Sequence, residues 1–482
     1  MRDILKAATK IGFGTLAGLL ASVITGKVLA LELGAAGIGL YGVLRQLLQT
    51  LTMVGTFNGQ SALVQGIARR TTEIEQVRFS GSVFCLQMAM ATTVALILLI
   101  CAPWLGPMLI PHLQAVAMLR WIAVAMLVSV ANLYIIGLLN GYRLVDSIVK
   151  YQVYGVIATL LLVYPSVLLI RNGHTFGFLL MLVGSAAFIT ITASRFLRRL
   201  GHLPKIRDLA VRRNDAAQFM GMSTALSIAG IVATGAQFAQ SWIVAKWMGL
   251  EHAGQFWAAW TLSMSYLTLV LGAMGTYYLP SLSRITDSEN RNELIRTYLK
   301  LVLMFVPLLV SIVILLKPLV IQLMFSSAML PSLDIMRWML IGDYFKAISY
   351  VMAYPMLAFN DMKWFLWSDI VFSLGMVGAN FGWIASGGNM EGLGMIFMFA
   401  YISFLVVAIS YMKIKNGFNV SYNEIVWFSS GLVLVILVSV STWDSTAVSM
   451  KDLAYFLLFL VIYAAISLRN FDWRSFKLFS RK

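Results

Sequence analysis

Charged side chains occur inside long apolar segments of this sequence, at positions where a charge facing lipid is costly. The set comprises Lys27, Arg45, Arg120, Arg337, Asp343, Lys346 and, near a helix end, Asp369. A charge in hydrocarbon costs at least about 2.5–3.5 kcal/mol, so residues of this kind usually face a cavity or a partner. The cations outnumber the acids, which suits an anionic ligand, and the planar arginine fork can donate two hydrogen bonds to one phosphate. We therefore expect the five cations to bind an anionic substrate.

The depth of each cation separates those that must face a cavity from those that can reach water. At 1.5 Å per residue, Arg45 lies about 12 Å and Lys346 about 16 Å from the start of its predicted helix. Lys27 is intermediate in depth. Arg120 and Arg337 lie only a few residues from a helix end, where a long side chain can alternatively extend to the lipid headgroups.

Asp343 and Lys346 are three residues apart, the spacing at which a carboxylate and an ammonium on one helix face can pair. One interpretation is a self-neutralising pair that lowers the cost of burial. The other is a switchable pair, in which an anionic ligand competes with Asp343 for Lys346. Asp343 is then the candidate residue for coupling transport to an ion gradient.

Fourteen apolar stretches of helix-spanning length surround these residues and place them in a membrane. A bilayer core about 30 Å thick needs roughly 20 apolar residues per helix. The composition agrees, with 60% hydrophobic residues, 12% charged residues and a mean hydropathy of +0.84. The predicted spans are 11–31, 37–58, 80–102, 116–139, 151–170, 175–194, 219–245, 253–279, 299–317, 335–359, 364–386, 392–412, 424–443 and 453–469. The predicted fold class is an all-α polytopic membrane protein.

Most of the 36 Lys and Arg residues lie at the termini or in every second connection between spans. Seven of them fall between Arg195 and Arg213, and another group runs from Arg469 through Lys482. Only Arg171, Lys246, Lys317 and Lys451 fall in the other connections. Because cytoplasmic loops carry the excess of Lys and Arg, both termini are predicted to be cytoplasmic. The net charge of +16 is therefore explained by topology and anionic lipid, and no nucleic-acid partner is expected.

The first six spans resemble the next six at a nearly constant offset. Gly37-Ile38-Gly39 matches Gly254-Gln255-Phe256 at 217 residues, and Asn140-Gly141-Tyr142-Arg143 matches Asn360-Asp361-Met362-Lys363 at 220. Six helices is an even number, so the halves enter the membrane in the same orientation. This predicts two six-helix lobes related by a pseudo-two-fold axis, with a shared site between them. The predicted divisions are 1–205, the N-lobe; 206–416, the C-lobe; and 417–482, a C-terminal helix pair with a basic tail.

Catalytic and metal-binding patterns are missing from the sequence. The four histidines stand singly, the predicted periplasmic connections are short, and Cys85 and Cys101 have no metal-ligand spacing. The sequence has no glycine-rich loop followed by Lys and Ser/Thr, which is the pattern that would indicate nucleotide binding. We expect no catalytic residue, no metal and no cofactor, which disfavours a membrane-bound glycan polymerase or acyltransferase. A multidrug exporter remains the alternative within transport, disfavoured by the positive charge of the predicted cavity.

Several short motifs resemble the Wzx-type polysaccharide flippases. In the N-terminal half these are Gly26-Lys27, Gly37-Ile38-Gly39-Leu40, Arg45-Gln46-Leu47 and Phe57-Asn58-Gly59. In the C-terminal half they are Tyr278 to Arg284 and Trp338 to Lys346, the latter containing Gly342-Asp343-Tyr344-Phe345-Lys346. The likeness covers about residues 5 to 412, and within the family it is greatest to the flippases of enterobacterial common antigen synthesis.

The resemblance implies the fold of the multidrug/oligosaccharidyl-lipid/polysaccharide exporter superfamily and an undecaprenyl-diphosphate-linked oligosaccharide as substrate. It also implies the bacterial inner membrane, membrane lipids as surroundings, and polymerase and chain-length proteins of glycan assembly as partners. The chain departs from the usual twelve helices of such flippases through its last two spans. Lipid II flippases of the same superfamily carry a comparable pair, which leaves the identity of the glycan open.

Energy coupling has three candidate sources in the absence of a nucleotide site. They are an ion gradient, the membrane potential acting on a moving charge, and consumption of the product on the far side. In the first case, substrate phosphate is expected to draw Lys346 away from Asp343, which then takes up a proton or a sodium ion.

Overall fold

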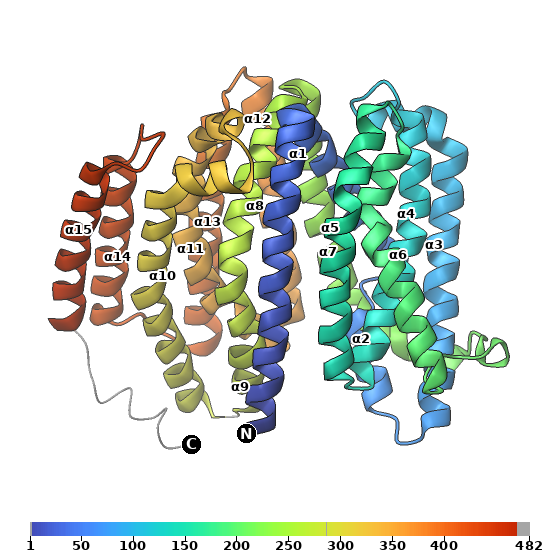
Figure 1. The fold of residues 1–482 in the computed structure, drawn as a ribbon. Helices are drawn as coiled ribbons and strands as arrows, with labels where there is room; N and C mark the ends of the chain where they lie inside the picture. The colour runs from blue at the N-terminus through green and yellow to red at the C-terminus, as the bar shows by residue number, and fades with distance from the viewer. Residues whose placement is uncertain (1, 286, 470–482) are drawn as a thin grey trace. The chain divides into compact units, whose positions relative to one another are not determined.

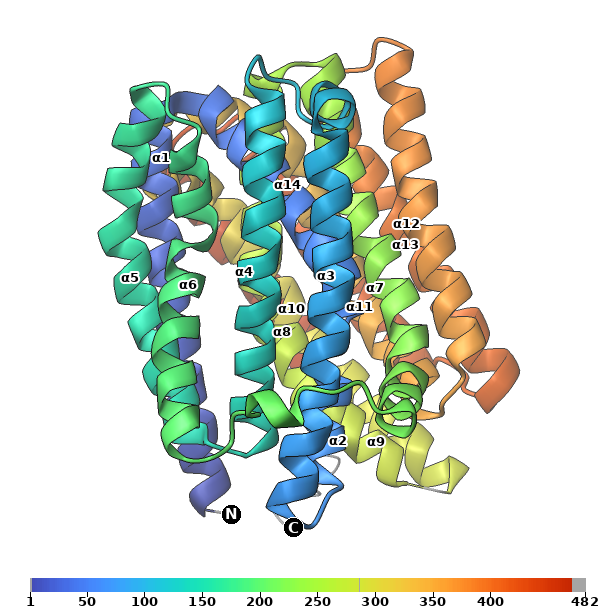
Figure 2. The same cartoon turned by 90° about the vertical axis from the view of Figure 1, so that its right-hand side faces the viewer.

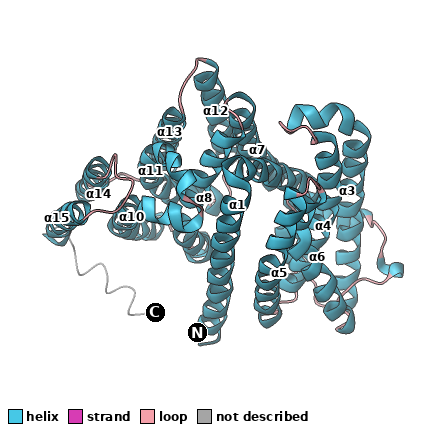
Figure 3. Ribbon diagram, turned by 45° about the horizontal axis from the view of Figure 1, so that its top comes forward, coloured by secondary structure: helices cyan, strands magenta, loops and turns pink. Residues whose placement is uncertain are grey.

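The computed structural model describes residues 2–285 and 287–469, and every regular element in these ranges is helical (Figure 3). Two compact units divide the chain, Met1–Gly254 and Gln255–Lys482. Within each unit the long helices run alongside one another (Figure 1). The basic C-terminal segment predicted from Arg469 onward lies almost entirely outside the described residues.

The first unit holds α1 (Arg2–Thr56), α2 (Gln60–Ala68), α3 (Glu73–Leu109), α4 (Ala115–Gly141), α5 (Val145–Arg171), α6 (Phe176–Arg199), the 3-10 turn η1 (Ile206–Asp208) and α7 (Arg213–Trp247). Helix α8 (Leu250–Ala273) starts in the first unit and continues in the second. The second unit then holds the π turn η2 (Met274–Tyr278), α9 (Leu279–Arg284), α10 (Ser288–Met324), the 3-10 turn η3 (Ser327–Ser332), α11 (Leu333–Ala358), α12 (Met362–Ala385), α13 (Met390–Asn416), α14 (Tyr422–Ser441) and α15 (Met450–Arg469).

Each of the fourteen predicted spans overlaps a helix. By length and composition, ten described helices are able to cross a membrane, or eleven if the bent pair 250–268 and 270–284 forms one span. Helix α1 is counted as one of the ten, although it contains two predicted spans. Helices α11 and α15 are not among the ten. The all-helical membrane fold is confirmed, and the number fourteen stays a prediction.

Gly34 separates the first two predicted spans within α1. Its backbone angles, φ 68° and ψ −170°, belong to a region that essentially only glycine occupies. The helix before Gly34 and the helix after it therefore meet at a sharp break. The sequence placed the connection between spans 11–31 and 37–58 at this point, and the break lies within it.

The domain boundaries stay a prediction, because compact units are not the same as repeats. The sequence assigns span 219–245 to the C-lobe, whereas the corresponding α7 packs against α1, α2 and α3 of the first unit. Asn58 Nδ2 on the turn after α1 donates to the carbonyl of Leu226 on α7 at 2.9 Å. Ser227 Oγ, also on α7, donates to the carbonyl of Phe57.

The C-terminal helix pair is fastened to the rest of the second unit at several levels. Arg296 on α10 donates from Nη1 to both carboxylate oxygens of buried Glu424 on α14, at 2.9 Å each. Tyr463 on α15 donates to the carbonyl of Leu303 at 2.9 Å. Tyr344 on α11 donates to the carbonyl of Phe428 on α14 at 2.7 Å. Helices α14 and α15 are thus integral to the second unit.

The start of α8 crosses the second segment of α1 at a distance that only glycine permits. A Cβ atom on Gly39 would lie 2.0 Å from the carbonyl oxygen of Leu250, and one on Gly254 would lie 2.1 Å from that of Ala35. Both glycines come from the repeated motifs that the sequence aligned. Backbone, not a flexible side chain, blocks the added atom at each position.

Gly39→Ala is expected to lower the free energy of unfolding by about 1–3 kcal/mol, as overpacking a close contact does. The measurement is the thermal unfolding midpoint of purified protein in detergent. Gly378→Ala on α12 is the matched control, because nothing lies within 4 Å of its added Cβ. Equal midpoints for both variants would contradict the close crossing.

Candidate functional site

Asp343 lies fully buried near the middle of α11, and its carboxylate is held by two hydroxyl groups of α8. Ser263 Oγ donates to Oδ1 at 2.7 Å, and Tyr266 OH donates to Oδ2 at 2.7 Å. Ser263 and Tyr266 are three residues apart, so both project from the side of α8 that faces α11. Each carboxylate oxygen therefore has its own donor, which stabilises the ionised form inside the protein.

Lys346 lies one helical turn after Asp343 and is 1% exposed. Its Nζ is 3.2 Å from the Sδ atom of Met264 on α8. The same ammonium lies 5.4 Å from the ring centre of Tyr401 and 5.7 Å from that of Phe397, both on α13. Such cation–π contacts contribute about 0.5–2 kcal/mol when desolvated, so the aromatic rings offset part of the burial cost.

The predicted ion pair between Asp343 and Lys346 is not formed. Within residues 2–285 and 287–469, no carboxylate oxygen lies within 4.0 Å of Lys346 Nζ. The reason is that the hydroxyls of α8 occupy the oxygens of Asp343, while the ammonium turns toward Met264 and the rings of α13. The two charges still lie one turn apart on one helix, where they attract each other without direct contact.

Close packing of α11 against α13 fixes the position of both groups. A Cβ atom on Gly394 of α13 would lie 2.3 Å from the carbonyl oxygen of Ile335 on α11. A Cβ atom on Gly342, the residue before Asp343, would lie 3.0 Å from the Cα atom of Met398. Because the two backbones touch at these glycines, the aromatic side chains of α13 reach Lys346.

Arg45 in the first unit is exposed, in contrast to the buried Asp343 and Lys346. Every other residue of the stretch 38–48 is buried, whereas the Arg45 side chain is exposed. Its Nη1 donates to the hydroxyl of Tyr41, one turn earlier on α1, at 3.2 Å. An exposed guanidinium in the middle of a buried apolar helix is accessible to a ligand.

Lys27 and Arg120 also belong to the first unit. Lys27 is half-buried on the first segment of α1, before the break at Gly34. Arg120 is exposed on the second turn of α4, close to the helix start. That position fits either of the two interpretations from the sequence, extension to headgroups or contact with a substrate.

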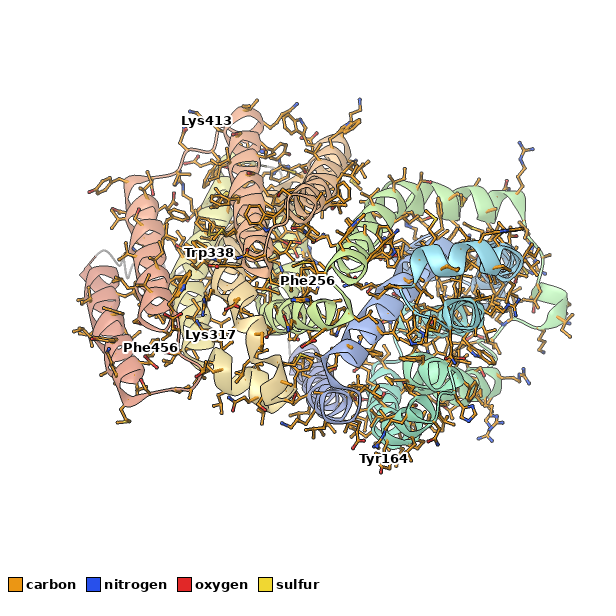
Figure 4. All side chains as sticks on the ribbon, turned by 90° about the horizontal axis from the view of Figure 1, so that it is seen from above. Tyr164, Phe256, Lys317, Trp338, Lys413 and Phe456 are labelled. Atoms are coloured by element: carbon orange, nitrogen blue, oxygen red, sulfur yellow. The ribbon has the colours of Figure 1, made fainter. Side chains whose placement is uncertain are left out.

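Arg337 is engaged in ion pairs at the beginning of α11. Its Nη1 lies 3.4 Å from Asp334 Oδ1, its Nη2 lies 3.3 Å from Asp444 Oδ1, and its guanidinium lies 5.3 Å from the ring centre of Trp443. These contacts join α11 to the connection between α14 and α15. Lys317, which the sequence placed in a connection, lies instead within α10 and is fully buried among the helices of the second unit (Figure 4).

Polar side chains near the end of the second predicted span form hydrogen bonds with backbone carbonyls. Thr56 Oγ1 donates to the carbonyl of Thr52 at 2.9 Å, and Gln87 Nε2 on α3 donates to the carbonyl of Thr56 at 3.0 Å. Gln60, Ser61 and Gln65 belong to α2, a short helix that the sequence did not predict. The contacts of Thr56 and Gln87 therefore hold the end of α1 against α3.

Ser263, Tyr266, Met264 and the two aromatic residues of α13 were missed by sequence reasoning. They surround Asp343 and Lys346 as side-chain partners from two other helices. The only signal was a serine and a tyrosine three residues apart in an otherwise apolar span, which does not indicate the partner that they face.

The histidines are dispersed, as their separate positions predicted. His202 stacks on Tyr142 with ring centres 4.0 Å apart, and His252 Nδ1 lies 2.8 Å from the carbonyl of Met248. His112 Nδ1, in the connection from α3 to α4, accepts the backbone N–H of Gln114 at 3.1 Å, and burial lowers the pKa of His112. In the described ranges no three His, Cys, Asp or Glu side chains form a group able to hold a metal ion.

Known structures share this fold. A lipid II flippase, MurJ in an inward closed conformation, matches with a TM-score of 0.69 at 15% identity, covering 96% of this chain and 98% of that one. An inward-facing multidrug resistance transporter of the MATE family matches with a TM-score of 0.68 at 14% identity, covering 85% of this chain and 98% of that one. The structure is therefore a multi-pass membrane protein with the fold of the MOP superfamily, to which the second match belongs.

Sequence comparison adds the family. The model of the polysaccharide biosynthesis protein family matches residues 28–334, and the chain belongs to that family. The lipid III flippase of Escherichia coli (strain K12) is 25% identical over 406 residues, which cover 83% of this chain and 96% of the relative. The likeness to Wzx-type flippases that the sequence suggested is thereby confirmed.

Tyr266→Phe is expected to lower the free energy of unfolding by about 1.5–3 kcal/mol, because it removes one donor from a buried carboxylate. Thermal unfolding in detergent measures the effect. Tyr277→Phe is the matched control, since Tyr277 is 52% exposed. If both variants unfold at the wild-type temperature, the hydroxyl of Tyr266 contributes nothing to holding Asp343.

Proposed function

We propose that the protein is a flippase that moves an undecaprenyl-diphosphate-linked oligosaccharide from the cytoplasmic to the periplasmic leaflet. The family match and the likeness to a lipid III flippase support a lipid-linked glycan as substrate. The structural observation that carries the proposal is Arg45, an exposed guanidinium inside a buried apolar helix. A diphosphate is the kind of group that a guanidinium binds with two parallel hydrogen bonds.

The likeness to a bacterial flippase supports the inner membrane as the location. The proposed orientation has both termini in the cytoplasm, because Lys and Arg gather at the termini and in alternate connections. Polymerase and chain-length proteins of glycan assembly are the expected partners on the periplasmic side. The glycan itself is an O-antigen, common-antigen or exopolysaccharide repeat unit.

Translocation proceeds by alternating access. In this mechanism Arg45 and Lys27 of the first unit are the proposed ligands of the diphosphate, and Lys346 is the candidate anion-binding cation of the second unit. Lys346 is buried in the present structure, so its exposure to substrate requires a change in the contacts around Met264 and α13. Arg337 has two carboxylate partners, which a ligand would have to replace.

A multidrug exporter is the second candidate, supported by the likeness to a MATE-family structure. Purified protein in vesicles distinguishes the two. A flippase transfers a fluorescent undecaprenyl-diphosphate oligosaccharide between leaflets, whereas an exporter moves a cationic dye and leaves the glycolipid in place. Joining of repeat units in the same vesicles would instead identify a glycan polymerase.

Arg45→Ala is expected to reduce glycolipid transfer in vesicles by roughly tenfold or more, since a hydrogen bond to a charged group contributes about 1.5–3 kcal/mol. Arg45→Lys keeps the charge without the two-pronged geometry and is expected to recover only part of the rate. Arg284→Ala, an exposed arginine at the end of α9, serves as the control. A wild-type rate for Arg45→Ala at equal protein level would remove Arg45 from the substrate site.

Asp343 is proposed as the coupling residue. Substrate phosphate draws Lys346 toward itself, and Asp343 then takes up a proton or a sodium ion as the protein changes conformation. Asp343→Asn is expected to bind glycolipid but to transfer it at a rate independent of the imposed gradient, measured in vesicles with and without proton and sodium gradients. Wild-type transfer that is equally fast in all these vesicles would leave Asp343 a structural partner of Ser263 and Tyr266, and would point to the membrane potential or product consumption.

A further inference from the structure

The end of α6, the connection to α7 and the first residue of α7 are strongly basic, and most of their cations are exposed. Residues 195–213 include seven Lys or Arg and one acid, Asp208. Six of the cations have exposed side chains: Arg195, Arg198, Arg199, Lys205, Arg207 and Arg213. In the part of the chain that the structure describes, none of these six forms an ion pair.

Large apolar side chains are exposed on the same segment. Ile206 is 89% exposed, Val211 is 54% exposed and Leu200 is 44% exposed. Ile206 lies between Lys205 and Arg207 in η1, so an apolar tip is flanked directly by two cations. We refer to residues 195–213 with these side chains as the 195–213 surface.

The 195–213 surface is held in place by α3. Ser82 Oγ donates to the carbonyl of Ala210 at 2.8 Å, and Arg212 Nη1 donates to the carbonyl of Arg78 at 2.9 Å. A Cβ atom on Gly81 would lie 2.5 Å from the carbonyl oxygen of Asp208, so the two backbones are in close contact. Figure 2 shows the connection crossing the outer side of α3 on its way from α6 to α7.

These anchor points fix the level of the surface relative to the membrane. Helix α3 is charged in its first turns, from Glu73 to Arg78, and has no charged residue from Phe79 onward. The change from charged to apolar residues marks the boundary between headgroups and hydrocarbon. Since the connection is attached at residues 78–82, its exposed side chains lie at that boundary.

We propose that the 195–213 surface binds the anionic headgroups of the cytoplasmic leaflet, with Ile206 inserted at headgroup level. A basic segment that also exposes apolar side chains gains both electrostatic attraction to anionic lipid and burial of apolar area at the interface. The competing occupant is an acidic protein of the cytoplasm. If that protein were the partner, Ile206 would remain in water when only lipid is present. The proposal uses the cytoplasmic orientation given above and does not depend on the transported substrate.

A fluorescent probe at position 206 tests the contact. In a Cys85→Ala, Cys101→Ala background, Ile206→Cys carries an environment-sensitive fluorophore, and the full-length protein is placed in vesicles that contain a headgroup-proximal spin-labelled lipid. Ile74→Cys is the matched control, because Ile74 is 66% exposed at the start of α3 but lies between Glu73 and Glu75. The expected result is blue-shifted, quenched emission at 206 in vesicles with phosphatidylglycerol, weaker quenching in pure phosphatidylcholine, and water-like emission at 74 in both.

Charge-neutralised variants separate electrostatic binding from apolar insertion. Arg198→Gln, Arg199→Gln and Arg207→Gln in combination are expected to abolish the difference between the two kinds of vesicle. Water-like emission at 206 in phosphatidylglycerol vesicles would overturn the proposal and indicate a soluble partner. Equal quenching in both lipids for the unneutralised protein would overturn the role of anionic headgroups. Because the readout is fluorescence, either outcome is independent of whether the protein flips a glycolipid.

Discussion

An ionised group in hydrocarbon is costly, and the structure shows four ways in which charged side chains inside this protein are stabilised. Asp343 is satisfied by two hydroxyl donors of α8. Lys346 lies against a thioether and two aromatic rings. Arg337 reaches acidic residues at a helix end. Arg45 keeps its guanidinium exposed while its neighbours on α1 are buried. The surroundings of these four residues are consistent with this constraint.

These different solutions make the charged residues unequal as ligand-binding groups. A cation that already has carboxylate partners must exchange them for a ligand, which gains little. The exposed guanidinium of Arg45 has a hydroxyl partner, Tyr41. A buried ammonium without a carboxylate within 4.0 Å, as at Lys346, has the most to gain from an anion but needs a conformational change to meet it. Arg45 and Lys346 therefore differ in what the binding of an anion would require of each.

The same constraint explains how the C-terminal helix pair is attached. Helices α14 and α15 present few polar groups, and those groups meet the second unit at defined points, such as Glu424 with Arg296 and Tyr463 with a carbonyl of α10. Buried contacts of this kind are costly to break one partner at a time. The pair is thus expected to move with the second unit. The structural match to MurJ covers 96% of this chain and therefore includes at least part of the pair.

The sequence by itself determined the membrane class, the helical fold and the approximate position of every long helix, because hydrocarbon admits only helices or closed barrels and the apolar stretches are long. It also placed a connection between two spans around Gly34 and aligned the motifs that contain Gly39 and Gly254, whereas their close contact came only from the structure. The short helix α2 was not predicted, since it is brief and its amphipathic pattern has too few residues to be recognised. Only the tertiary structure decided which charges are paired. The contacts of Asp343 with α8 and of Lys346 with α13 join residues more than 50 positions apart, and their geometry depends on how helix backbones approach one another, which local sequence does not encode.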